Sequence, residues 1–467
     1  MPPLPEPPGS VHHPPFHPAV ARAAVRVDEE HVHAAGRIVD GAPSTSSCRG
    51  AQLATGVVDA SPVHDRNASL RVATALFWVL ILILAGCHRR EGVRSPVRRL
   101  PPLGQRLLVL APHPDDEVLG AGGLMLAGRS EGARIAVVVL TDGEAGGRAS
   151  LRGDDLAATR EEETRRALAH LGPELAVRFL GYADGRLGWA WSEHWTAVRR
   201  DGTEESTQTI VDDIRGALRA AAPSAVLLPM PLDEHPDHRA LNRLTLLALL
   251  GEWREREDPE LLAYLIHAGH DWPPGAPSDP CTQLLFPWTR LVLDRATQEE
   301  KSALIRDYGS QLGRRGAILR FARPEEPFVR GQIIRADRPV GRTHPGVDRV
   351  PEGVVVRLLR TRCILGADRE DRLRLRFFRA GSVEERVIEL GSPPTAIGGP
   401  AGHPLQPAGD VRIAVTTRAV RLELGGDLPE LAGAVLEVLP GNRPGAVAPA
   451  WLLIWNARAS ALPPPSS

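Results

Sequence analysis

Two short segments of the sequence combine histidine with acidic residues at close spacing. The first lies in LLVLAPHPDDEVLG, residues 107–120, and its reactive side chains are His113, Asp115, Asp116 and Glu117. The second is PLDEHPDH, residues 231–238, and its reactive side chains are Asp233, Glu234, His235, Asp237 and His238. Neutral imidazoles and ionised carboxylates, both available near pH 7, are ligands for divalent metals. A His-Asp-His set that leaves coordination positions open is typical of a catalytic metal such as zinc.

Strands and helices are predicted to alternate around these two segments. Apolar, β-rich runs predict strands over 106–112, 133–141, 177–180, 225–230 and 261–267. Helices are predicted over 118–131, 154–171, 208–221 and 236–250. This alternation predicts an α/β fold in which a mostly parallel sheet is covered by helices on both faces.

Each of the two segments follows a predicted strand, where ligands bind in sheets of this kind. They could therefore converge on one point, although His113 and His235 are 122 positions apart (235 minus 113). Either segment alone is also compatible with an ordinary helix start, because acidic residues favour the first turn. Two such segments at strand ends, with prolines in both turns, favour one shared site.

The motifs resemble those of the PIG-L/LmbE-like N-acetylglucosaminyl deacetylases. The main matches are APHPDDE and EHPDH, and the weaker ones are LTDGEAGG (140–147), TREEETRRALAHLG (159–172), FLGYADG (179–185) and YGSQL (308–312). The resemblance covers residues 104–330. It implies a Rossmann-like fold and the zinc-dependent removal of an acyl group from an amino sugar.

The resemblance also implies roles for individual residues. The metal ligands would be His113, Asp116 and His238, with zinc as the metal and another divalent ion such as Fe²⁺ as the alternative. Asp115 would be the general base, and a rival assignment exchanges it with Asp116. His235 would stabilise the oxyanion or protonate the leaving amine.

Two further acidic residues have competing interpretations. Asp237 either orients a histidine, as a group that supports the catalytic residues, or caps the helix that begins there. Glu117 is interpreted as a structural residue of the first turn of its helix rather than as a catalyst.

Candidate substrate contacts follow from the weaker motifs and from nearby aromatic residues. Arg160 would contact a sugar or phosphate, or else form a surface ion pair with Glu163 one turn away. Asp184 resembles a loop residue that binds sugar hydroxyls. The segment that follows contains Trp189, Trp191 and Trp195, which either offer a stacking platform for sugar rings, with Trp189 as the expected contact, or form a lid or small core.

The N-terminal part of the chain has a different character. Residues 1–69 are predicted to be disordered or not translated, with a true start near residue 63. Residues 70–87 contain an apolar run, Val72 to Gly86, whose last three residues form Leu-Ala-Gly-Cys together with Cys87. This pattern favours a signal peptide with a lipobox, and the alternative is a short membrane anchor, which the following arginines support. Residues 88–103 would be a linker, and the expected location is the cell envelope, as an extracytoplasmic lipoprotein.

The rest of the chain sets limits on partners and architecture. The 467 residues suffice for two domains, 104–335 and 340–460, and strictly alternating runs such as 373–377 predict a C-terminal antiparallel β-sandwich-like domain. A net charge of −1 argues against nucleic acid. The pairing of Cys281 with Cys363 and the oligomeric state are left open.

Two functions follow from these observations. The first is an enzyme that acts on an amino-sugar glycoconjugate, polysaccharide or glycolipid. The second is a non-catalytic lipoprotein that binds carbohydrate or lipid on a decayed deacetylase scaffold. The complete set of histidines and aspartates favours the enzyme.

Overall fold

A computed structural model describes the chain from Arg106 to Asn456 with internal gaps. The described ranges are 106–146, 152–173, 175–192, 194–252, 258–268, 273–274, 285–313, 316–337, 345–351, 353–359, 365, 371–379, 381–390, 411–415, 419–441 and 448–456. They all belong to one compact unit, His88–Ser467. The predictions for residues 1–103 and for the four cysteines lie outside the described residues. None of the helices in the described ranges combines the length and the apolar character that a membrane span needs.

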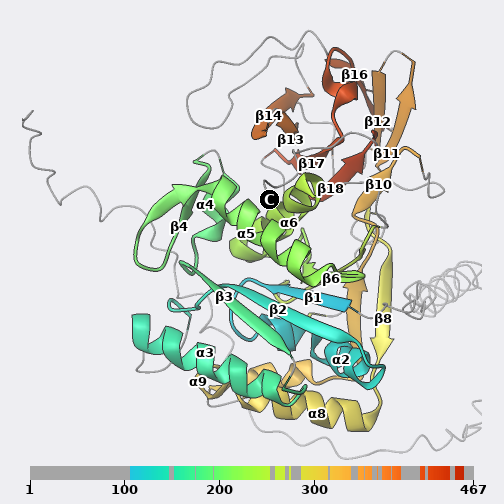
Figure 1. Cartoon of the computed structure of the whole chain (residues 1–467). Coiled ribbons are helices and arrows are strands. Elements are labelled where there is room, and N and C mark those ends of the chain that lie inside the picture. Colours follow the sequence, from blue (N-terminus) through green and yellow to red (C-terminus); the bar gives the residue numbers. More distant parts are fainter. Residues whose placement is uncertain are drawn as a thin grey trace, which may run out of the picture. The chain divides into compact units, whose positions relative to one another are not determined.

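A seven-stranded sheet forms the centre of the region from Arg106 to Val329 (Figure 1). Its strands are β1 Arg106–Ala111, β2 Arg134–Thr141, β3 Ala176–Tyr182, β6 Ala225–Pro229, β7 Glu260–Tyr264, β8 Trp288–Val292 and β9 Glu325–Val329. They lie in the order β3-β2-β1-β6-β7-β9-β8. The first five are parallel, and β9 and β8 add antiparallel strands at one edge. The predicted mostly parallel sheet is confirmed.

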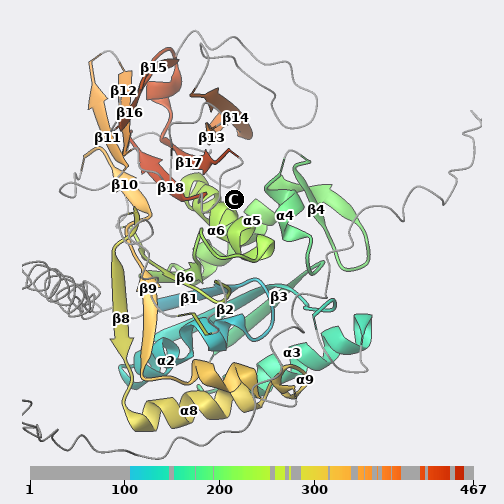
Figure 2. The same ribbon diagram turned by 180° about the vertical axis from the view of Figure 1, so that it is seen from behind.

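Helices cover both faces of this sheet, as predicted (Figures 1 and 2). The long helices are α2 Asp116–Ser130, α3 Gly153–Ala169, α5 Thr207–Ala221, α6 Pro236–Gly251 and α8 Arg295–Arg306. Both faces of β1 are apolar: Leu108 and Leu110 join a buried cluster that includes α5 and α6, whereas Leu107 and Val109 join one that includes α2 and α8. A strand that is buried on both sides reads as a continuous apolar run, which is why residues 106–112 could be identified from sequence.

The strand order reverses between β1 and β6. β1 pairs with β2 on one side and with β6 on the other, and the register places Val109 opposite Val137 and Leu227. The chain leaves β1 and β6 at the same edge of the sheet because the two strands are parallel. A reversal of this kind opens a crevice beyond the carboxyl ends of the two strands.

Two further sheets form the β-rich C-terminal region. One contains β10 Ile333–Arg335, β18 Ala450–Ile454, β17 Gly433–Leu439, β13 Arg372–Arg379 and β14 Ser382–Glu389, and the other contains β11 Gly346–Val350, β12 Gly353–Leu359, β16 Ala419–Leu424 and β15 Val411–Val415. A short 3₁₀ helix, η3, spans Leu428–Glu430. Each pair is antiparallel except β10–β18. The predicted antiparallel sheets are confirmed, and their packing as a sandwich stays a prediction.

Short elements that the sequence analysis did not predict connect the larger ones. They are α4 Leu187–Ala190, the hairpin of β4 Thr196–Val198 and β5 Glu204–Ser206, α9 Gly309–Leu312 and the 3₁₀ helix η2 Ala317–Phe321. Elements of three to five residues carry too few positions for a periodic pattern.

A buried ion pair anchors α2 to its neighbours. Lys301 of α8 donates to Leu119 O at 2.8 Å and lies 2.5 Å from Glu326 of β9. Glu326 also accepts the backbone N–H groups of Gly123 and Leu124, at 2.6 and 2.9 Å. The carboxylate fits there because position 123 is glycine, where a Cβ atom would lie 2.8 Å from Glu326 Oε1.

Replacing this lysine should strongly destabilise the protein. Lys301→Met leaves the buried Glu326 carboxylate without its counter-ion, and we expect the free energy of unfolding to fall by about 3–5 kcal/mol. Denaturant unfolding measures the change. Arg295→Met removes the exposed partner of Glu299 on the same helix and should have little effect. An equal loss in both variants would contradict the prediction.

Candidate active site

The first part of the site is the turn that joins β1 to α2. Asp115 is the residue before α2 and has a φ of 102°, which is unusual for a residue other than glycine. The Asp115 carbonyl accepts the N–H of Leu119 at 2.9 Å, so the helix begins directly after the turn. Such backbone strain persists where the surrounding structure enforces it and is common at functional sites.

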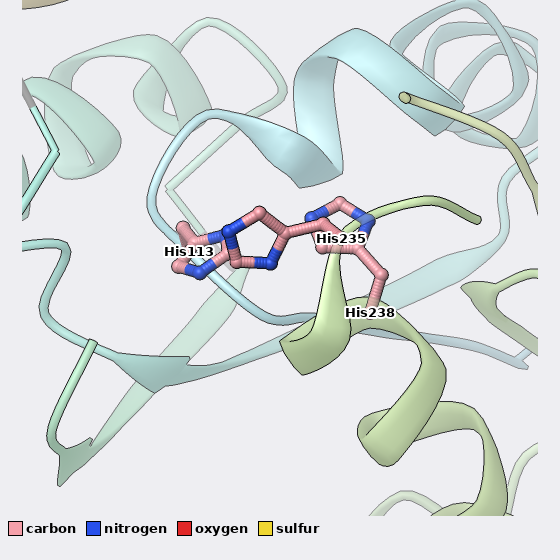
Figure 3. Close-up of side chains that lie close together, drawn as sticks. All are labelled: His113, His235 and His238. Carbon is pink, nitrogen blue, oxygen red and sulfur yellow. The ribbon is translucent and has the colours of Figure 1, made fainter. Parts of the chain in front are cut away.

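The second part of the site is the start of α6, directly after β6. Pro236 lies in the first turn of α6, and His235 caps the helix because its Nδ1 accepts the N–H of Asp237 at 3.3 Å. The alternative that Asp237 caps this helix is therefore wrong. The imidazole rings of His113, His235 and His238 lie close together, with centroids 4.8 to 5.3 Å apart (Figure 3).

Three predicted metal ligands converge within this group. Asp116 Oδ2 lies 3.0 Å from His113 Nδ1 and 3.1 Å from His238 Nε2. Ligand atoms around a tetrahedral zinc lie about 3.3 Å apart, given zinc–ligand bonds of about 2.0–2.1 Å. Both separations from Asp116 Oδ2 are close to this value, so Asp116 could share a metal of this size with either histidine.

His238 adds a second indication that the residues suit a cation. Its side chain is fully buried, and carboxylate oxygens of Asp116 and Asp233 lie 3.1 and 3.2 Å from its two ring nitrogens. Within the described ranges neither contact has the geometry of a good hydrogen bond, which is costly for buried polar atoms. Three overlapping sets of side chains in the described part of the chain have ligand atoms within 4.8 Å of one another: His113, His235 and His238; Asp233, His238 and His267; and His113, Asp184 and Asp237.

In both His113 and His238, the ring nitrogen that does not contact Asp116 also lies close to a carboxylate. His113 Nε2 lies 3.1 Å from Asp184 Oδ1 and 3.3 Å from Asp237 Oδ2, and His238 Nδ1 lies 3.2 Å from Asp233 Oδ2. Burial opposes protonation of His238, but Asp116 and Asp233 outweigh it and raise its pKa to about 9. The site therefore attracts positive charge, and each histidine has a carboxylate that orients its ring.

The Asp115 carboxylate lies beside Arg160. Burial raises the pKa of Asp115 to about 7, and Arg160 opposes that rise. The Arg160 guanidinium lies 3.3 Å from Asp115 Oδ2, donates to Gly143 O at 3.0 Å and also donates to Pro114 O. Arg160 thus holds the turn that carries Asp115, and its role as a substrate contact stays a prediction.

The alternative interpretation of Arg160 is wrong. Arg160 and Glu163 are both 3% exposed, and the Glu163 carboxylate accepts the N–H and the hydroxyl of Ser310 at 2.7 and 2.6 Å. These two residues therefore do not form a surface ion pair. The long-range partners, Asp115 and Ser310, could not be read from spacing along the helix.

Glu117 lies in the first turn of α2, as predicted, and is fully buried. It accepts the Tyr308 hydroxyl, and its Oε2 accepts the N–H of Asp115 at 3.1 Å. Burial raises the pKa of Glu117 to about 8. These contacts tie the turn of Asp115 to the segment that contains Tyr308.

Two residues of the site, Asp233 and His267, had no role predicted from the sequence. Asp233 accepts the N–H groups of Ile266 and His267 at 3.0 and 3.1 Å, and its Oδ1 lies 3.3 Å from His267 Nδ1. His267 follows β7, so it lies at the same sheet edge as the two motifs. The position of a lone histidine at the end of a predicted parallel strand could have identified it.

The loop between β3 and β4 contains the other predicted substrate residues. Asp184 is brought to His113, and its N–H donates to Glu144 Oε1 at 2.8 Å. Trp189 is 42% exposed and stacks with Arg186, whereas Trp191 and Trp195 are buried. The core interpretation is therefore confirmed for Trp191 and Trp195, and a stacking role stays a prediction for Trp189.

Comparisons with known proteins find similarity over the part of the chain that contains the two motifs. A family model described as GlcNAc-PI de-N-acetylase (PIG-L) matches residues 108–249. A diacetylchitobiose deacetylase of Thermococcus kodakarensis is 29% identical over 139 residues, which are 29% of this chain and 45% of that protein. A 1D-myo-inositol 2-acetamido-2-deoxy-alpha-D-glucopyranoside deacetylase of Tsukamurella paurometabola is 34% identical over 169 residues, 31% of this chain and 55% of that protein.

The chain spans about half the length of these curated relatives. Among solved structures, the N,N'-diacetylchitobiose deacetylase from Pyrococcus horikoshii matches with a TM-score of 0.33 and 23% identity, over 44% of this chain and 70% of that one.

Proposed function

We propose that this protein, in which residues 108–249 form a PIG-L-family domain, is a metal-dependent hydrolase that removes an N-acetyl or other N-acyl group from an amino-sugar substrate. The observation that carries the proposal is the convergence of His113, Asp116 and His238 beside Asp115, at the carboxyl ends of β1 and β6. The names of the curated relatives, which are deacetylases of N-acetylated sugars, support the same reaction and substrate class.

In this proposal His113 Nδ1, Asp116 Oδ2 and His238 Nε2 hold zinc or another divalent ion such as Fe²⁺. When bound, such an ion would polarise the amide carbonyl and lower the pKa of water. Asp237 and Asp184 orient His113 from its other nitrogen, and Asp233 orients His238 in the same way.

Asp115 is proposed as the general base, which takes a proton from the attacking water. Arg160 and the strained turn hold its carboxylate, which interacts electrostatically with Asp116, His113 and His238. A carboxylate that does not ligate the metal is free to accept that proton.

His235 is proposed to donate a hydrogen bond to the oxyanion, and Asp115 passes the proton that it takes from the water to the leaving amine. The Nδ1 of His235 accepts the backbone N–H of Asp237, so a neutral ring carries its proton on Nε2. A fixed donor of this kind stabilises charge that develops in the transition state. Asp184 and Trp189 are proposed to bind the sugar, with Arg160 as a further candidate.

We propose attachment to the membrane through residues 70–87 and a location in the cell envelope. Both rest on the apolar run of that segment.

Acetate release from a panel of N-acetyl sugars tests the function. The full chain is purified, its metal content is measured, and free, lipid-linked and polymer-linked N-acetyl sugars are offered. We expect about one divalent ion per chain and acetate release from at least one substrate, lost on chelation and restored by the metal. A protein that lacks metal and releases no acetate from the panel would support the non-catalytic binder instead.

A further inference from the structure

One loop connects the candidate active site to the β-rich C-terminal region. We define the substrate loop as residues 183–195, between β3 and β4, of which Glu193 is outside the described residues. At its start, Gly185 N and Gly188 N donate to the Asp237 carboxylate at 2.7 and 3.3 Å. This end of the loop also contains Asp184, which contacts His113.

The other end of the substrate loop is held by Arg376 of β13. The Arg376 guanidinium donates to the carbonyl oxygens of Trp191 and Ser192, at 2.9 and 3.2 Å. Its central carbon lies 4.1 Å from the ring centroid of Trp191 and 4.5 Å from that of Trp195. One buried side chain thus binds the loop by two hydrogen bonds and two cation–π contacts.

Glu437 of β17 holds the same loop and also contacts α6. Its Oε2 accepts the indole N–H of Trp191 at 2.9 Å, and its Oε1 lies 2.5 Å from Arg243 Nε. Arg243 belongs to α6, the helix whose first turn contains His238. Burial opposes ionisation of Glu437, but Arg243 and Arg374 outweigh it and hold its pKa below the ordinary value.

The two central charges of this cluster, those of Arg376 and Glu437, are buried and paired. Arg376 is 1% exposed and pairs with Glu385 at 2.6 Å, and Glu437 is 5% exposed between its two arginines. Buried charges are costly unless they are paired in good geometry, so their partners are fixed in position. The loop that they hold is fixed with them.

We infer that the β-rich region fixes the geometry of the active site, a role that we call a brace. Arg376 and Glu437 are its positioning residues, and they hold the substrate loop in a fixed position relative to α6. Asp184 and Trp189 then meet the sugar at a fixed distance from His113 and Asp115. The effect of the brace on sugar binding and catalysis rests on the proposed function. The contacts that form the brace do not, because they join described residues.

Arg376→Met tests the brace, with Arg379→Met as the matched control. Arg379 lies on the same strand, and its partners, Glu384 and Asp427, belong to the β-rich region. In the first variant only, we expect faster hydrogen exchange in peptides from 183–192. We also expect KM for the acetylated sugar identified in the screen to rise, and kcat/KM to fall by up to about 10²-fold, at unchanged metal content.

A second pair of variants, with smaller changes, tests the brace if Arg376→Met fails to fold. Trp191→Phe removes the indole N–H that binds Glu437, and Trp455→Phe removes one that donates to Leu428 O at 3.1 Å within the β-rich region. Loop exchange should rise in the first and stay unchanged in the second.

The two measurements separate the brace from the proposed function. Faster loop exchange without any acetate release would keep the brace and reject the hydrolase. Equal loop exchange in each variant and its control would overturn the brace. A lower kcat at unchanged KM, without a change in loop exchange, would overturn it as well, since loss of folded protein alone produces that pattern.

Discussion

Asp115→Asn is expected to lower kcat by about 10²–10⁴-fold, the usual contribution of a general base. Asparagine keeps the size and nearly the shape of the side chain but cannot accept the proton of the attacking water. The metal content should stay near one ion per chain, because Asp115 is not in the proposed ligand set. KM should change little, since the proton transfer occurs only in the transition state.

The matched variant is Asp116→Asn, one position along the chain. Asp116 Oδ2 lies within 3.1 Å of both ligand histidines, so this variant should lose metal. The rival assignment, in which the two aspartates exchange roles, predicts that Asp115→Asn loses metal and Asp116→Asn keeps it. A near-normal kcat in Asp115→Asn would show that the proposed mechanism is wrong even for a working deacetylase.

Removal of any proposed ligand should abolish metal binding and activity together. We expect this result for His113→Ala, Asp116→Ala and His238→Ala, because three ligands leave no spare donor in the set. The fold should persist, since the apolar clusters on the two faces of the sheet are separate from these side chains. Metal analysis and circular dichroism measure the two effects separately.

His170→Ala is the control for these variants. His170 follows α3 and pairs with Asp307 at 2.9 Å, and it is not part of the proposed site. It should keep both metal and activity. If one of the three alanine variants kept full metal affinity, the residue replaced in it would not be a metal ligand.

The sheet and the two motifs could be predicted because their signals are local. Buried parallel strands such as β1 and β6 read as short apolar runs, and residues that follow such strands must meet at one edge. The convergence of His113 with His238 follows from this rule together with the strand order.

Other parts of the site depend on partners that are distant in the sequence. Arg160 contacts Asp115 across 45 positions (160 minus 115), and Trp191 contacts Glu437 across 246. A helical or aromatic pattern in the sequence indicates whether a side chain is exposed on average. It does not indicate which distant residue that side chain contacts. The antiparallel strands β8 and β9 and the short hairpin were missed because their sequences lack a sustained apolar pattern.

The buried pair of Lys301 and Glu326 has a practical consequence for labelling experiments. Lys301 is the only lysine in the sequence and is 1% exposed. An amine-reactive ester therefore finds no accessible ε-amino group in the described part of the folded chain, and it acylates this site only when α8 separates from α2. The rate at which the peptide containing Lys301 becomes labelled would then report the equilibrium between the closed and open forms of that region.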